Sequence, residues 1–276
     1  MDGIINVDES LCIGCGSCIR TCPGGLITKG DKAPVPTAGY SPDMCIDCGH
    51  CVAVCPTGAM HQRTMSPEDC APLDIHLVPT WDQAKQFLDS RRSVRVYVNK
   101  PVEKEKIQKC IERARYAPNG GNRQIVRWVA ISDPEKVRHI AQMTIDWMKS
   151  MKESNPGLHK EAKLGLFTKE WDEGHDQISR GAPCIIQAWA PAEKDERTAP
   201  QAATIGLAYV QLAAHAQGLG STWSGGINTA VQAYPPLTEY LGLPKGTVSY
   251  GTILLGQPAE TFVRIPARKT LDVTWI

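Results

Sequence analysis

The sequence predicts a mixed helix-and-sheet protein in two parts: a small cysteine-rich segment, and then a larger α/β or α+β sandwich. Eight of the eleven cysteines lie between residues 12 and 55, whereas helical and strand patterns alternate from residue 80 onwards. Within the larger part, residues 201–217 are apolar on nearly all sides, which is typical of a helix buried centrally or in a subunit interface. We therefore expect one domain over 1–62, a linker over 63–79 and a second domain over 80–276.

The composition is that of an ordinary globular protein, with 42% hydrophobic residues, 21% charged residues and a formal net charge of +1. This balance indicates neither a nucleic acid nor a membrane surface as a partner. No apolar run reaches transmembrane length, and residues 1–5 lack the basic and apolar regions of a secretory signal. We expect a cytoplasmic protein whose cysteines are reduced.

The cysteine-rich segment contains one pattern, C-x2-C-x2-C-x3-C-P, that occurs twice. The first copy is Cys12, Cys15, Cys18 and Cys22 before Pro23, and the second is Cys45, Cys48, Cys51 and Cys55 before Pro56. This is the spacing of a bacterial ferredoxin with two 4Fe–4S clusters, in which the last cysteine of each run ligates the other cluster. We therefore assign Cys12, Cys15, Cys18 and Cys55 to one cluster, and Cys45, Cys48, Cys51 and Cys22 to the second.

Zinc and disulfides are the alternatives to iron and sulfide. Structural zinc uses paired C-x2-C knuckles and needs neither a third cysteine at the same interval nor a following proline. Ile13, Gly16 and Pro23 match Ile46, Gly49 and Pro56 at one constant offset, which favours a duplicated, two-cluster half-domain. Of the cysteines outside the pattern, Cys110 and Cys184 are interpreted as small core residues, and Cys70 lies in the linker without an assigned role.

The elements follow in order. Residues 23–44, rich in glycine and proline, predict turns and a short hairpin. A helix is expected from Thr80, which with Gln83 forms a capping box, and its apolar face is Trp81, Ala84, Phe87 and Leu88. Further on, the patterns predict a helix over 102–116, a strand over 128–131 and a helix from Pro134 to about Met151, capped by Asp133.

The second half of the larger part is less regular. Residues 152–180 are polar and weakly patterned, and are interpreted as a lid or insertion. A strand over 183–190 precedes the apolar helix 201–217, after which residues 219–226 are expected as a strand and loop. A short helix over 236–241, a strand over 249–255 and an extended tail over 271–276 complete the chain.

The sequence contains no G-x-G-x-x-G after a strand and no P-loop, HExxH or G-x-S-x-G motif. The functional hypothesis therefore depends on three polar groups in the larger part. Each group alone has an ordinary interpretation as a solvated helix end or a turn. They are the group Arg91, Arg92, Ser93 and Arg95, the pair Asn122 and Gln124 in the turn Ala117 to Gln124, and the pair Arg268 and Lys269.

Their order along the chain resembles the nitroreductase family of FMN enzymes over roughly residues 80–276. Arg91 to Arg95 is similar to the family's opening, and Ala117 to Gln124 to its A-P-S-G-G-N-x-Q segment, with Asn119 replacing serine and Ile125 following in place of proline. Leu212 to Gly226 is similar to its helix and glycine-rich flavin loop. The further markers are Leu241 to Pro244, Leu255 to Pro258, and Arg268 with Lys269.

The resemblance implies a nitroreductase-like α+β homodimer with FMN at the subunit interface and a C-terminal arm that embraces the partner. Arg91, Arg92, Ser93 and Arg95 would hold the FMN phosphate and ribityl chain, and Arg268 and Lys269 would complete the phosphate site. The ring would contact the residues of the turn and of the glycine-rich loop. These are Pro118, Asn119, Gly120, Asn122 and Gln124, and Thr222, Trp223, Ser224, Gly225 and Gly226.

The resulting hypothesis is an iron–sulfur flavoprotein that passes electrons from its clusters through FMN to a small acceptor such as a nitroaromatic or quinone. NAD(P)H and an external ferredoxin are both candidate donors. We name no catalytic side chain, and interpret His215 as a packed helix residue. Two other functions remain open: an electron-transfer protein that relays electrons between a ferredoxin pool and a protein partner, and a flavin-dependent dehydrogenase or desaturase.

Overall fold

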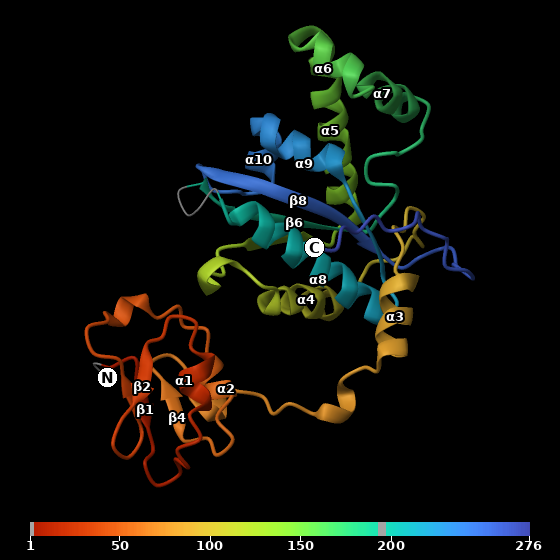
Figure 1. Ribbon diagram of the computed structural model, residues 1–276. Helices are drawn as coiled ribbons and strands as arrows, with labels where there is room; N and C mark the ends of the chain where they lie inside the picture. Colours follow the sequence, from red (N-terminus) through yellow and green to blue (C-terminus); the bar gives the residue numbers. More distant parts are fainter. Residues whose placement is uncertain (1–2, 193–196) are drawn as a thin grey trace. The chain divides into compact units, whose positions relative to one another are not determined.

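The computed structural model describes residues 3–192 and 197–276, and the chain divides into two compact units (Figure 1). The first unit extends to Val78 and includes Gly121–Arg123, and the second comprises Pro79–Gly120 and Gln124–Ile276. Each unit has its own buried core, so each is described separately.

The first unit is built from two short antiparallel strand pairs and two short helices. The strands are β1 (Ile5–Val7) paired with β4 (Met60–Gln62), and β2 (Ile27–Lys29) paired with β3 (Pro34–Pro36). The helices are α1 (Ser17–Thr21) and α2 (His50–Ala53). Met60, Ile27 and Val52 are buried between them with two of the cysteines, Cys18 and Cys51. The pair β2–β3 is the hairpin predicted within residues 23–44.

The duplication predicted from the cysteines is visible in the backbone. Helix α1 begins after Gly16, at φ 69°, and helix α2 after Gly49, at φ 71°. These two glycines occupy the same position in the two copies of the pattern, and the left-handed conformation they share is the one that favours glycine. The residue two positions earlier is also left-handed in both halves, but it is Gly14 in the first half and Asp47 in the second.

The second unit is organised around a four-stranded antiparallel sheet in the order β5–β6–β8–β7. The strands are β5 (Arg127–Ile131), β6 (Cys184–Pro191), β7 (Gly220–Trp223) and β8 (Thr247–Gly256). The two central strands, β6 and β8, are almost wholly buried, as expected of strands covered on both faces.

Helices cover both faces of this sheet (Figure 1). One face packs against α4 (Lys104–Arg113) and α8 (Ala199–Ala216), and the other against α5 (Pro134–Ser154), α9 (Gly225–Ala233) and α10 (Pro235–Tyr240). Helices α6 (Pro156–Glu161) and α7 (Leu164–Asp172) pack on α5, and α3 (Trp81–Ser90) opens the unit. The predicted helix–sheet sandwich is therefore confirmed.

Helix caps agree with the sequence, but one predicted apolar face does not. Thr80 and Gln83 form the expected capping box, and Asp133 caps α5 through the amides of Glu135 and Lys136. The predicted face of α3 is wrong as a core face, because Trp81 and Leu88 are exposed, whereas Ala84 and Phe87 are half-buried and the Phe87 ring lies 5.2 Å from the His215 ring. The helix lies at the surface of its unit.

Two further expectations are corrected. Residues 219–226 are not a strand and loop throughout, because α9 begins at Gly225 directly after β7. No helix was predicted within residues 152–180, but α6 and α7 occupy more than half of this segment. Cys110 and Cys184 are both fully buried, as predicted for core residues.

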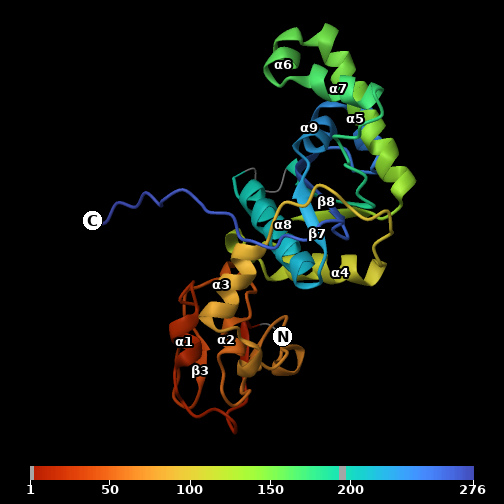
Figure 2. The ribbon, with the colours of Figure 1, turned by 90° about the vertical axis from the view of Figure 1, so that its right-hand side faces the viewer.

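The C-terminal segment after β8 runs as an extended chain along and then away from the second unit (Figure 2). The amide of Ala259 donates to the carbonyl of Val96, whereas Leu271 and Trp275 are 86% and 89% exposed. Among the helices that the structure describes, none is long and apolar enough to cross a membrane.

Candidate functional site

Four of the cysteines line one small cavity in the first unit. They are Cys12, Cys15, Cys18 and Cys55. Cys55 comes from the second copy of the repeat, and it reaches the first copy because β1 pairs with β4 just beyond it. The chemistry of the donor set fits an iron–sulfur cluster, since four thiols from two loops converge on one enclosed space. These are the four cysteines that the spacing assigns to one cluster, and that assignment stays a prediction.

Three of the remaining four cysteines lie close to one another in the second copy of the repeat. Burial, with smaller contributions from the neighbouring charges of Cys48 and Cys45, raises the pKa of the Cys51 thiol to about 11. A buried thiolate is stabilised when a metal ion supplies the compensating positive charge. The fourth member, Cys22, accepts a hydrogen bond on its sulfur from the amide of Leu26, at 3.4 Å.

Asp47 braces the loop that carries Cys45. Its carboxylate accepts two hydrogen bonds from Arg63, at 2.8 and 2.9 Å, and this pairing lowers the pKa of Asp47. Arg63 also donates to the backbone carbonyl of Cys45, at 3.2 Å. The buried amide of Gln62 donates to the sulfur of Cys45 at 3.7 Å and also to Asp47. The first copy has Gly14 in place of Asp47 and therefore has no carboxylate for such a brace.

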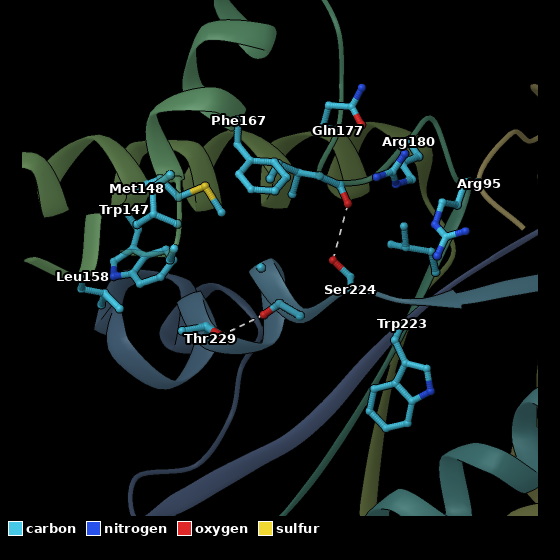
Figure 3. A pocket seen from close by; sticks show the side chains of 16 residues that line it. Arg95, Trp147, Met148, Leu158, Phe167, Gln177, Arg180, Trp223, Ser224 and Thr229 are labelled. Atoms are coloured by element: carbon cyan, nitrogen blue, oxygen red, sulfur yellow. Dashed lines mark hydrogen bonds between the residues drawn. The ribbon is translucent and has the colours of Figure 1, made fainter. Parts of the chain in front are cut away.

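The second unit contains a cavity of about 490 Å³ above the edge of the sheet (Figure 3). Five residues predicted from the sequence line it: Arg95, Trp223, Ser224, Gly225 and Gly226. The loop from β7 into α9 supplies four of them, and the extended segment beside β7 supplies Arg95. The structure thus brings together two groups that lie far apart in the sequence.

Gly225 leaves the backbone open where it faces this cavity. A Cβ built there would meet nothing within 4 Å, and its φ lies outside the left-handed region, so the local fold does not require glycine. Gly225 is also the first residue of α9, whose N-cap Ser224 makes no side-chain capping hydrogen bond. Backbone amides at a helix start are donors suited to the oxygens of a ligand.

The other wall of the cavity was not predicted. It comes from α5 to α7 and from the turn before β6, and includes Trp147, Met148, Leu158, Phe167, Gln177 and Arg180. Arg180 has φ 55° in a turn held by Asp176, whose carboxylate accepts from the amides of Ile178 and Ser179. The sequence signal for this turn was the pair Asp176 and Gly181 flanking an arginine, just before a strand.

Arg91 and Arg92 line a second cavity, of about 360 Å³, together with His215 and the start of β7. Burial lowers the pKa of the Arg91 guanidinium, and the charges of Arg92 and Arg268 lower it further. The Nη1 atom of Arg91 is buried and has no hydrogen-bond partner among the described residues. An orphaned cationic donor beside two further arginines fits an anionic group such as a phosphate. Lys269 is exposed.

The two cavities are separated by one extended segment. Ser93 bridges to Ser221 in β7, and the amide of Val94 donates to the Ser221 carbonyl at 3.1 Å. Side chains alternate along such a segment, so Val94 and Arg95 face different cavities. The segment lies so close to β7 that a Cβ on Gly220 would be 2.6 Å from Val94. Thr222, also predicted as a ligand contact, is buried within β7 and lines neither cavity.

The predicted turn is divided between the two units. Asn119 and Gln124 line a third cavity, of about 370 Å³, and the Asn119 side chain accepts from the Gln124 amide at 2.9 Å. Pro118 and Gly120 are exposed. Asn122 belongs to the first unit, where its side chain donates to the carbonyls of Ile46 and Asp47, at 3.1 and 2.9 Å.

Comparison with known proteins identifies both units. Residues 88–257 match the model of the nitroreductase family, and residues 11–59 match the 4Fe-4S dicluster domain. A protein of Archaeoglobus fulgidus, provisionally named an NADH dehydrogenase/NAD(P)H nitroreductase, is 23% identical over 181 residues, which are 65% of this chain and 87% of the relative. An FMN reductase [NAD(P)H] of Bacillus subtilis is 24% identical over 189 residues, 65% of this chain and 67% of the relative.

The fold of the second unit also occurs in solved structures. A nitroreductase with bound FMN from Desulfitobacterium hafniense superposes with a TM-score of 0.56 at 21% identity, covering 69% of this chain and 96% of the other. At this level of identity the likeness establishes the fold of the larger unit.

Proposed function

The chain belongs to the nitroreductase family and is an FMN-dependent oxidoreductase with a 4Fe–4S domain before it, and from this membership we propose a specific electron path. Electrons pass from two 4Fe–4S clusters, or from NAD(P)H, through FMN to a small electron-poor acceptor such as a nitroaromatic or a quinone. The observation that carries the proposal is the buried, unpartnered Nη1 of Arg91 beside Arg92 and Arg268, a charge arrangement suited to the FMN phosphate.

In this proposal Arg91 and Arg92 hold the phosphate, with Arg268 and Lys269 completing the site. Ser93 lies between the phosphate cavity and the cavity of Arg95, and so contacts the ribityl chain. Guanidinium groups suit the phosphate because their forked donors match its oxygens. Burial and the charges of Arg92 and Arg268 all lower the pKa of Arg91, which supports an anionic ligand in this cavity, although Glu260 also lines it.

The residues around the larger cavity receive the flavin ring. Ser224, Gly225 and Gly226 offer backbone amides at the start of α9, and the missing side chain at Gly225 allows a flat ring to approach the backbone. FMN, when bound, accepts electrons singly or in pairs and so couples one-electron clusters to a two-electron acceptor. No side chain is assigned as a general acid, and protons come from solvent.

The predicted turn supports a homodimer. Asn119 and Gln124 line a cavity separate from those of Arg91 and Arg95, so a site that uses all three groups is incomplete within one chain. We propose that a second copy supplies the turn residues, including Pro118, Gly120 and Asn122, and that the exposed C-terminal segment contacts that copy. Its exposed apolar residues Leu271 and Trp275 are consistent with such a contact.

Anaerobic purification followed by cofactor analysis tests the proposal. We expect FMN released on denaturation at one per chain and iron at about eight per chain. Reduction of a neutral nitroaromatic or a quinone by NADH, NADPH or reduced ferredoxin should follow. A protein that contains no flavin, or one that retains flavin but reduces no small acceptor with any donor, would contradict the proposed function.

A further inference from the structure

The larger cavity of the second unit has two guanidinium groups at one end. Figure 3 shows Arg95 and Arg180 side by side there, coming from the segment next to β7 and from the turn before β6. Burial, and after it the charge of Arg95, lower the pKa of Arg180, so the two guanidinium groups are close enough for Arg95 to act on Arg180. Two like charges in one partly buried site are destabilising unless a ligand of opposite charge offsets them.

No carboxylate among the described lining residues offsets these charges. The acidic group that acts on Arg180 is Asp176, and its oxygens are occupied by the turn, accepting from the amides of Ile178, Ser179 and Gly181 and from the Ser179 hydroxyl. Tyr97, which also lies near Arg180, donates its hydroxyl to the Val94 carbonyl at 2.7 Å. Among the described residues, Arg180 forms no salt bridge.

Arg180 is held in place by its backbone. Its φ of 55° is a left-handed conformation that residues with a side chain adopt rarely. The hydrogen bonds of Asp176 on either side of it impose this conformation. The turn thereby fixes where the Arg180 side chain leaves the backbone, at the wall of the cavity that it lines.

The opposite end of the same cavity is apolar. Trp147, Leu158, Met148 and Phe167 gather there, on α5, α6 and α7, away from the two arginines (Figure 3). The two ends of the cavity therefore differ in chemistry: one end is positively charged, and the other is lined by aromatic and other apolar side chains. A flat ring that carries one anionic substituent matches both ends.

We propose that the acceptor of this enzyme is an aromatic compound with a carboxylate or similar anionic substituent, and that Arg180 is the residue that selects it. This inference rests on the proposed function and names the substrate class of the same cavity. Arg95 remains assigned to the flavin, whereas Arg180, which comes from a different element, binds the anionic substituent of the acceptor. The apolar end accommodates the ring of the acceptor.

Binding to the oxidised, FMN-loaded protein tests the proposal without any turnover. Two probes of similar size are titrated calorimetrically, 4-nitrobenzoate and the neutral 4-nitrobenzyl alcohol. The wild type should bind the anion more tightly. R180Q should reduce the affinity for 4-nitrobenzoate by a factor at least about ten times larger than the factor for the alcohol, because a charge-assisted hydrogen bond is lost. R180K should recover part of the preference, and R138Q, at an arginine of α5 that stacks on Trp171, should leave both affinities as they are.

The outcomes separate this inference from the proposed function. Equal binding of the two probes by the wild type, or equal weakening of both by R180Q, would overturn the selection of anions, even if the protein reduces neutral nitro compounds. Loss of FMN from R180Q on gel filtration would assign Arg180 to the flavin and would also overturn it. If R180Q loses affinity for NADPH but keeps its affinity for 4-nitrobenzoate, Arg180 binds the electron donor, and the proposal is overturned.

Discussion

The side-chain amide of Gln62 donates to the sulfur of Cys45 across 3.7 Å. Hydrogen bonds to cluster sulfurs stabilise the reduced, more negative state and raise the reduction potential. We therefore expect Q62L to lower the potential of the cluster that Cys45 ligates, by on the order of tens of millivolts, and to leave the other cluster unchanged. Redox titration followed by electron paramagnetic resonance measures both.

Lys29 provides the matched control, because it occupies the position in the first copy of the repeat that corresponds to Gln62, and its side chain is exposed. K29L should shift neither potential. If Q62L moves both potentials equally, or neither, the hydrogen bond to Cys45 does not tune one cluster selectively.

The crosswise arrangement of ligands predicts which cysteines act together. C55S should damage the cluster of Cys12, since both line one cavity, and C22S should damage the cluster of Cys45. Iron content and Mössbauer spectra of C12S, C22S, C45S and C55S check this pairing. If C22S and C12S instead remove the same cluster, each run holds its own cluster and the assignment is wrong.

Arg91 should be needed for flavin retention. R91A removes the buried donor whose Nη1 has no partner among the described residues, and we expect the Kd for FMN to rise at least about tenfold. Fluorescence titration of the deflavinated protein measures this change, with R138A as the control. Full FMN occupancy in dilute R91A would refute the assignment of the phosphate to this cavity.

Gly225 offers a test of the ring site that does not alter charge. In G225V the added side chain would extend into open space, so the unfolding temperature should change little while FMN affinity falls strongly. Thermal unfolding of the flavin-free variant and FMN titration separate the two effects. The control is G157V, at an exposed glycine of α6 where an added Cβ would meet only the Asn155 side chain, at 3.7 Å. Unchanged affinity in G225V would place the flavin elsewhere.

His215 should make the flavin-free second unit sensitive to acid. Burial lowers the pKa of His215, the charge of Arg91 lowers it further, and its Nε2 lies 2.9 Å from the Ser90 hydroxyl. The unfolded chain therefore binds a proton more readily than the folded one. Stability should be full above the unfolded pKa, near 6.5, and should fall as the pH drops below it towards the lower folded value.

Thermal midpoints measured from about pH 7.5 to about pH 5, the range in which histidine titrates, check this prediction in wild type, H215Q and the exposed control H76Q. The difference between wild type and H215Q should grow in favour of the variant as the pH falls. A constant difference across the range would show that His215 does not contribute to the pH dependence.

The features that could be predicted from the sequence are those determined by residues close together in the chain. The cap at Asp133 and the capping box of Thr80 are local chemistry, and both form as expected. The face of α3 was predicted from spacing alone, and spacing cannot reveal whether another element covers Trp81. Helices α6 and α7 were missed because exposed polar residues dilute the apolar spacing of Leu164 and Phe167.

For the candidate site too, the sequence could not reveal contacts that depend on the three-dimensional fold. The resemblance to a family brought Arg95 and Gly225 into one hypothesis, and the structure places both on one cavity. Arg180 was outside that resemblance, and its position depends on a turn whose φ is imposed by Asp176. Which residues share a cavity depends on the alternation of side chains beside β7, a property of three-dimensional pairing.

The short stretch from Arg91 to Arg95 packs against β7 where Val94 meets Gly220, and it borders both the cavity of Arg91 and the larger cavity of Arg95. An anion that fixes Arg91 and Arg92 on one side therefore restrains Arg95 on the other, because all three belong to the same stretch of chain. Occupancy of the Arg91 cavity should reduce the conformational freedom of the larger cavity. A chain without bound phosphate would then hold its larger cavity loosely, and cofactor loading itself would prepare the enzyme to discriminate among acceptors.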